Sequence, residues 1–278
     1  MSRTRIQNGE HEDHSRVARL TEDRGVRHAL IRGVTRVFAI AVLLLPLSIG
    51  VTAWLGAQRH ADASADALAA LRSDAQVLIE QGPFLTLTPR SMSRSIGVIF
   101  YPGAYADIRG YVPVMREIAA AGYRVVIVPM PLEMAIFGID RGVEVMRRYP
   151  EIARWVLIGH SVGGAMTGPF AHRHPEQLAG VIIYDSYPAG SLADYDKPVW
   201  HIHRATLDGA PTPAFEAQRH RFPADSRWVP IRGGIHMYFG SFSGGGYNED
   251  WAPSITREAQ HRQVVAATLE ALEAMSTG

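Results

Sequence analysis

A serine flanked by glycines follows a short apolar run in the middle of the chain, and this pattern limits the folds open to it. Residues 156–158 are apolar, residues 159–163 read Gly-His-Ser-Val-Gly, and small residues follow. This is the strand–turn–helix order of a nucleophile elbow, a turn so tight that glycine is needed two positions before and after the serine. We therefore expect Ser161 to lie exposed at the carboxyl end of a central strand, where α/β sheets bind ligands, and to act as a nucleophile.

Short apolar runs alternate with helical patterns on both sides of this motif. Strands are expected over residues 95–100, 124–128, 154–158, 180–184, 198–203 and 227–231, and helices over residues 111–121, 132–148, 162–172, 212–220 and from a cap at Ser254 to residue 275. Strands separated by helices form right-handed crossovers and a parallel sheet that is covered on both faces. The sequence thus predicts an α/β fold with a mostly parallel, doubly wound sheet.

Near the N-terminus, residues 37–57 form an uncharged apolar run that is long enough to cross a bilayer as a helix. Arginines crowd its N-terminal side and aspartates follow its C-terminal side, which predicts a single-pass anchor with the N-terminus in the cytoplasm and the folded domain outside it. The alternative is a signal peptide that is cleaved near residues 61–63, with secretion of the rest. The expected organisation is a polar cytoplasmic tail (1–36), a transmembrane helix (37–57), a linker helix with a lead-in (58–92) and a folded domain (93–278).

Composition excludes several kinds of site. The formal net charge is +1 and the chain has no cysteine. The charge balance does not suggest a nucleic-acid partner, and the lack of cysteine rules out thiol nucleophiles, thiolate zinc sites and disulfides. His201 and His203 share one face of a predicted strand, but no third ligand has suitable spacing, so a packed pair is expected and not a metal site.

Several short motifs, taken in order, resemble the α/β-hydrolase fold, and more narrowly a small, lidless group related to the dienelactone-hydrolase-like enzymes. They are Tyr101-Pro102-Gly103-Ala104, Met130-Pro131-Leu132, Arg154-Trp155, the motif around Ser161, Asp208-Gly209, and Gly233-Gly234-Ile235-His236 with Phe239-Gly240. The resemblance extends from about residue 95 to the C-terminus. It departs at Ile235, where the family tends to have a polar residue, and in the loop at 241–246, which we expect to be flexible.

A serine hydroxyl needs an adjacent base, and the base needs an orienting carboxylate. Hydrolases of this fold present them in the order serine, acid, histidine. His236 follows the last predicted strand in a glycine-rich loop and is the expected base. Asp208 follows the strand at 198–203, and Asp185 ends the preceding strand. The family resemblance favours Asp208 as the acid, with Asp185 as the alternative.

Two backbone N–H groups are expected to form the oxyanion hole. One is that of Val162, directly after the nucleophile. The resemblance places the other at Gly103 or Ala104, since Pro102 has no N–H to donate.

The resemblance implies a serine hydrolase without a cofactor, which cleaves a carboxylic ester or related acyl bond of a small molecule through an acyl-enzyme. The apolar run at 37–57 predicts that this enzyme is anchored in a membrane. Only about a dozen residues separate Asp185 from Pro198, too few for a helical lid. The alternatives are an acyltransferase or peptidase with the same triad, and a non-catalytic binding protein on the same fold.

Overall fold

The computed structural model describes residues 58–91 and 94–276, together with residues 33, 35, 42, 50, 51 and 56. The chain divides into two units, residues 1–55 and 56–278, and all elements named below belong to the second unit. The predicted tail at 1–36 and most of the predicted membrane helix at 37–57 lie outside the described residues. Among the residues that are described, no helix is both long and apolar enough to span a bilayer.

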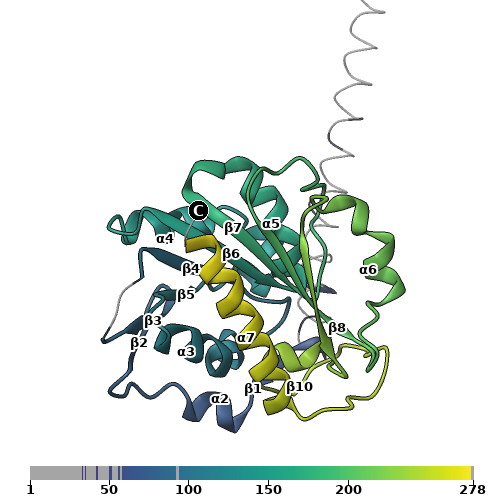
Figure 1. Cartoon of the computed structure of the whole chain (residues 1–278), viewed down its shortest axis with the longest axis horizontal. Helices are drawn as coiled ribbons and strands as arrows, with labels where there is room; N and C mark the ends of the chain where they lie inside the picture. Colours follow the sequence, from purple (N-terminus) through teal and green to yellow (C-terminus); the bar gives the residue numbers. More distant parts are fainter. Residues whose placement is uncertain are drawn as a thin grey trace, which may run out of the picture. The chain divides into compact units, whose positions relative to one another are not determined.

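An eight-stranded sheet occupies the centre of this unit, in the order β2-β3-β5-β4-β6-β7-β8-β9 (Figure 1). The strands are β2 (Val77–Gln81), β3 (Leu85–Pro89), β4 (Ile96–Tyr101), β5 (Val125–Ile127), β6 (Arg154–His160), β7 (Leu178–Tyr184), β8 (Val199–Ala205) and β9 (Arg227–Arg232). The pairs β2–β3 and β3–β5 are antiparallel, and every pair from β5 to β9 is parallel. The prediction of a mostly parallel sheet is therefore confirmed.

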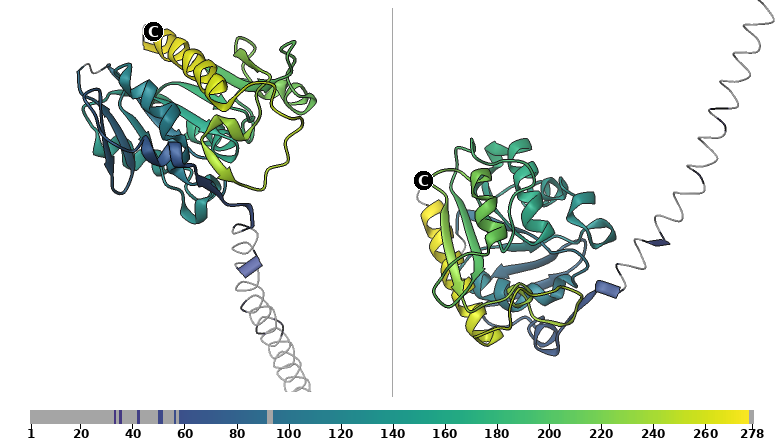
Figure 2. Two further views of the ribbon diagram at one scale, coloured as in Figure 1. Left: turned by 90° about the horizontal axis from the view of Figure 1, so that it is seen from below. Right: turned by 90° about the vertical axis from the view of Figure 1, so that its right-hand side faces the viewer.

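Helices cover both faces of the sheet because both faces of each central strand are apolar. In β4, Val98 and Phe100 belong to one hydrophobic cluster and Ile99 and Tyr101 to another. The first cluster is closed by α3 (Val112–Ala120) and α7 (Arg257–Ser276), and Figure 2 shows α7, in yellow, lying along that face. The second is closed by α4 (Arg141–Arg148) and α5 (Val162–Arg173). The sheet is thus doubly wound, as predicted.

The prediction of one linker helix after residue 57 is wrong. The segment forms β1 (Ala61–Ala63), the short helix α2 (Ala65–Ala69) and then β2. β1 pairs antiparallel with β10 (Phe242–Gly244), which lies in the glycine-rich loop predicted to be flexible. Tertiary pairing and burial outweigh the helix propensity of the alanines here. β2 and β3 also belong to the main sheet, although they precede the predicted start of the folded domain at residue 93.

The predicted helix at 132–148 begins later than expected. Two 3₁₀ turns, η2 (Pro131–Glu133) and η3 (Ala135–Phe137), precede α4. Leu132 and Glu133 have φ values of 52° and 55°, a left-handed conformation that an α-helix does not contain. The remaining short elements are α6 (Pro213–Ala217), η1 (Ile108–Tyr111), η4 (Pro175–Gln177), η5 (Arg219–Arg221) and η6 (Met237–Phe239).

Candidate active site

Ser161 lies at the sharp turn between β6 and α5, with φ 53° and ψ −122°. A non-glycine residue adopts such a backbone only where its surroundings enforce it. A Cβ at Gly159 would collide with the backbone of Gly163, and a Cβ at Gly163 would collide with the backbone of Tyr101. The close approach predicted from the glycine spacing is therefore present.

The expected base, His236, lies between β9 and η6 and is 5% exposed. Its Nδ1 atom is 2.6 Å from Oδ2 of Asp185, which directly follows β7 and is buried. This bond leaves Nε2 as the ring nitrogen available to a serine hydroxyl. His236 and Ser161 line the same cavity. The carboxyl edge of the parallel strands thus brings serine, histidine and a carboxylate together.

The structure does not bring Asp208 to the histidine, so the expectation that Asp208 is the acid is wrong. Asp208 is exposed, accepts hydrogen bonds from the Thr206 hydroxyl and, at 3.1 Å, from the Ala210 N–H, and these bonds lower its pKa. It forms an ordinary Asp-Gly turn, in which Gly209 has φ 91°. Asp185, the alternative, is the carboxylate that is bonded to His236.

A buried arginine, which the sequence analysis did not single out, holds Asp185 from the other side. The Arg204 N–H donates to Oδ1 of Asp185 at 2.8 Å, and the guanidinium donates to Oδ2. Burial opposes ionisation of Asp185, but the hydrogen bonds and charges of His236 and Arg204 outweigh it and hold the pKa of Asp185 well below its usual range. The signal that could have indicated Arg204 was a charged residue near the end of a strand whose residues are all buried.

The backbone before the histidine is fixed by α7. The N–H of Ile235 donates to Oε1 of Gln260 at 2.9 Å, and Nε2 of Gln260 donates back to the Ile235 carbonyl at 2.8 Å. Gln260 is fully buried. Ile235 thus helps to position His236 through its backbone. This positioning does not require the polar side chain that the family tends to have at 235.

Tyr111 bears on which residue, Gly103 or Ala104, has a backbone N–H free for the oxyanion hole. The Gly103 N–H donates to the Tyr111 hydroxyl at 3.0 Å, and that hydroxyl lies 2.9 Å from Nδ1 of His160. No hydrogen bond among the described residues uses the Ala104 N–H. Val162 begins α5, and the first N–H groups of a helix have no intrahelical acceptor. The two N–H groups free for an oxyanion are therefore those of Ala104 and Val162.

The cavity beside Ser161 has a volume of about 350 Å³ and is mainly apolar and aromatic. Besides the residues above, it is lined by Arg59, Ala61, Tyr105, Ala106, Met134, Met237, Phe242, Gly246 and Tyr247. The Tyr247 ring stacks on His236, with centroids 3.8 Å apart. This size and lining suit a small, largely apolar molecule.

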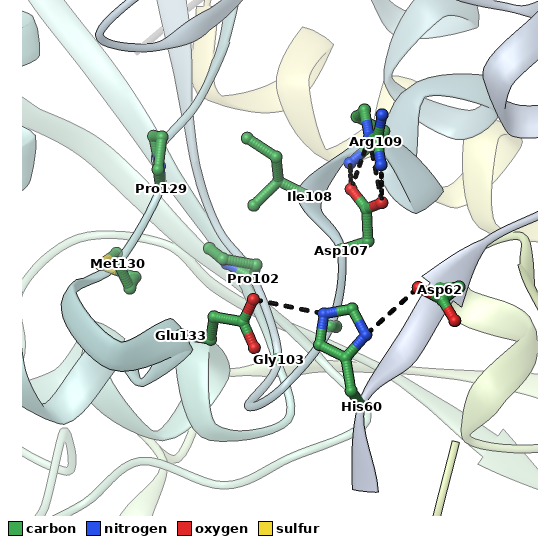
Figure 3. A pocket seen from close by; sticks show the side chains of 11 residues that line it. His60, Asp62, Pro102, Gly103, Asp107, Ile108, Arg109, Pro129, Met130 and Glu133 are labelled. Atoms are coloured by element: carbon green, nitrogen blue, oxygen red, sulfur yellow. Dashed lines mark hydrogen bonds and ion pairs between the residues drawn. The ribbon is translucent and has the colours of Figure 1, made fainter. Parts of the chain in front are cut away.

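A second cavity of about 340 Å³ shares Gly103 and Ala106 with the first (Figure 3). His60 lies between two carboxylates there, with Nε2 3.2 Å from Oε1 of Glu133 and Nδ1 3.4 Å from Oδ1 of Asp62. Arg109 is paired with Asp107. These ionisable side chains partner one another, but the three carboxylates outnumber the Arg109 guanidinium and the His60 imidazole, so the lining carries an excess of negative charge.

His201 and His203 are buried against each other, with ring centroids 4.8 Å apart, and aromatic side chains surround them. Burial lowers the pKa of both imidazoles. Within the part of the chain that the structure describes, no three histidine, aspartate or glutamate side chains are grouped as metal ligands.

Comparison with known proteins agrees with this architecture. A model of the "Alpha/beta hydrolase family" matches residues 97–262, more than half of the chain. No curated protein sequence matches the chain. Similar solved structures include a thermophilic esterase from Thermogutta terrifontis (13% identity, 74% of this chain and 100% of that one, TM-score 0.50) and Est1E from Butyrivibrio proteoclasticus (13%, 72% and 100%, 0.49). Naproxen esterase from Bacillus subtilis is also similar (11%, 68% and 92%, 0.44). At 13% identity, the likeness to the esterase from Thermogutta terrifontis is one of fold alone.

Proposed function

Because the chain belongs to the alpha/beta hydrolase family, we propose that it is a serine hydrolase that cleaves a small carboxylic ester or related acyl bond. The observation that carries the proposal is the hydrogen bond between His236 and the buried Asp185, beside a cavity that also holds Ser161. A buried carboxylate on Nδ1 is the arrangement in which an imidazole serves as base toward a serine.

In the proposed reaction, Ser161 Oγ attacks the acyl carbon while Nε2 of His236 takes the hydroxyl proton. Asp185 stabilises the imidazolium that forms, and the N–H groups of Val162 and Ala104 bind the oxyanion, each contributing about 3 kcal/mol to transition-state stabilisation. The imidazolium then protonates the leaving alkoxide, which departs as the alcohol. Water, deprotonated by the same imidazole, releases the carboxylic acid and restores the serine.

The proposed substrate is a small ester. The cavity of about 350 Å³ is at the lower end of small-molecule sites, and its apolar walls favour an uncharged acyl group. The segment between β7 and β8 is short and contains no helix, so a lid over the site is not expected there. These features support a short-chain esterase more than a lid-gated lipase.

We also propose that residues 37–57 anchor the enzyme in a membrane, with the catalytic domain on the extracytoplasmic side. The support is the uncharged length of this run and the arginines before it. Recovery of the full-length chain in the membrane fraction after alkaline carbonate washing is expected. Protein released in soluble form, with an N-terminus near residues 61–63, would favour the secreted alternative.

The test of the enzymatic proposal is a series of p-nitrophenyl esters of graded acyl length, assayed with the wild type and Ser161→Ala. We expect hydrolysis that is fastest for short acyl groups and lost in the variant. Undiminished hydrolysis by a folded Ser161→Ala protein would refute the proposal.

A further inference from the structure

Arg204 is a charged side chain in a place where charge is costly. It lies near the end of β8 and is 5% exposed. A guanidinium this buried is tolerated only when its N–H groups find partners, because an unpaired buried charge is strongly destabilising. The partners of Arg204 come from two separate parts of the chain, one in the triad and one in the loop after β10.

On the triad side, Arg204 shares an oxygen atom with the histidine. The Arg204 guanidinium and Nδ1 of His236 both bond to Oδ2 of Asp185, while the backbone N–H of Arg204 donates to Oδ1. Arg204 therefore fixes the orientation of the carboxylate, and it places a positive charge close to the imidazole.

On the loop side, Arg204 holds the segment 247–251. Its Nη2 atom is 2.7 Å from Oδ2 of Asp250 and 3.2 Å from the Tyr247 hydroxyl, and its Nε atom is 3.2 Å from the same Asp250 oxygen. Asp250 itself is about half exposed, with 47% of its side chain accessible. The loop is thus tied to the buried arginine by its own side chains.

The same loop contacts His236 in two further ways. The Tyr247 ring stacks on the imidazole at an interplanar angle of 19°. The Glu249 carboxylate accepts hydrogen bonds from the N–H groups of His236 and Met237, each at 2.8 Å. Gly244 and Gly245, with φ values of 75° and 102°, precede this segment, which forms no regular secondary structure before α7. Ordering such a loop loses conformational entropy that its contacts must offset.

We propose that Arg204 is a positioning residue: by holding Asp185 and Asp250 together, it keeps the 247–251 segment packed on His236 and the imidazole aligned with Ser161. This rests on the proposed function. Arg204 does not line the cavity beside Ser161, and Tyr247 is the one residue of the 247–251 segment that does. Removal of Arg204 therefore acts mainly on the alignment of the base and changes one wall of the cavity.

Two readouts separate this role from a merely structural one. Misalignment of the base lowers kcat and leaves KM nearly unchanged, since most of the cavity wall comes from residues outside the released segment. Release of the 247–251 segment also raises the hydrogen exchange of its amides, which is measured without substrate.

The experiment compares Arg204→Gln, Arg204→Lys and Asp250→Asn in the full chain, with Arg227→Gln as control. Arg227 is an exposed arginine at the start of β9, paired with Glu270. We expect Arg204→Gln to lower kcat by about a hundredfold with KM within about twofold. Arg204→Lys keeps the charge but cannot hold both carboxylates, so it also lowers kcat.

Asp250→Asn is expected to lower kcat by about tenfold alone and to add little in the Arg204→Gln background, because both changes release the same loop. Hydrogen exchange of residues 245–251, measured without substrate, rises in both variants and not in Arg227→Gln. If Arg204→Gln does not fold, Asp250→Asn and Arg204→Lys carry the test.

The two proposals fail in different ways. If the wild type hydrolyses esters but kcat and hydrogen exchange are unchanged in Arg204→Lys and Asp250→Asn, the role of Arg204 is refuted and the proposed function stands. Fully additive effects of Arg204→Gln and Asp250→Asn would overturn it too. A wild type that hydrolyses no ester refutes the proposed function, and the exchange of residues 245–251 then still decides whether Arg204 orders the loop.

Discussion

The two aspartates that follow neighbouring strands, Asp185 and Asp208, should respond very differently to the same substitution. Replacement of either by asparagine keeps the size of the side chain and removes its charge. Asp185 is buried against Nδ1 of His236 at 2.6 Å, whereas Asp208 is exposed in its own turn. The pair therefore forms a matched test of which carboxylate serves the histidine.

The magnitude follows from the bond that is lost. An asparagine at 185 can turn its NH₂ group toward Nδ1, which then has to accept, so that Nε2 carries the proton and cannot take one from Ser161. An equivalent change in a serine protease triad lowers kcat about 10⁴-fold, and we expect a loss of that order for Asp185→Asn. Since Arg204 also loses a buried partner, the free energy of unfolding should fall by about 3 kcal/mol.

Asp208→Asn removes the charge but keeps an oxygen that can still accept from Thr206 and Ala210. We expect kcat within about twofold of the wild type and a change in unfolding free energy within about 0.5 kcal/mol. The assay is steady-state hydrolysis of p-nitrophenyl acetate at pH 7.5, with urea unfolding of each variant. An inactive Asp208→Asn beside an active, folded Asp185→Asn would refute the reasoning.

Three further changes test other parts of the account. Ala104→Pro removes the N–H assigned to the oxyanion hole and should lower kcat by about 10²-fold or more. Ala104→Gly keeps this N–H and should retain most activity. Equal losses in the two variants would point to disruption of the backbone and contradict the assignment. His201 has a pKa well below its ordinary value because it is buried, so below about pH 6.5 the unfolded chain binds a proton that the folded chain does not, and stability falls with falling pH. His201→Leu should reduce this pH dependence of the unfolding free energy by up to about 1.4 kcal/mol per pH unit, measured by urea unfolding between pH 7 and pH 5. The same pH dependence in the variant as in the wild type would contradict the prediction. Gly163→Ala places a Cβ against the Tyr101 backbone and should yield little folded, active protein. Gly82→Ala, at a glycine with open space around it and no positive φ, should remain active. Normal yield and activity of Gly163→Ala would be inconsistent with the tight elbow.

Local sequence was enough to predict the central part of the fold. The buried parallel strands are continuous apolar runs, and the glycines at 159 and 163 specify the elbow directly. The strands that were missed have weaker local patterns. β1 lies in an alanine-rich stretch and β10 in a glycine-rich one, and the two pair with each other across about 180 residues.

Local sequence likewise identified some residues of the candidate site and not others. Ser161 and His236 were found because each lies in a distinctive local sequence. Asp185 and Asp208 follow adjacent strands, and topology permits either as the acid, so only the positions of their side chains decide between them. Arg204 could not be assigned in advance, because its partners lie in loops that are distant in the sequence.

The central claim is that Ser161 forms a covalent acyl-enzyme with His236 as its base. The most direct measurement is mass spectrometry of the intact chain and its peptides after brief reaction with p-nitrophenyl acetate and acid quenching. We predict one added acetyl group, on the peptide that contains Ser161, in the wild type and none in His236→Ala. Acetylation at other residues only, or acetylation of Ser161 that is equally fast without His236, would contradict the account.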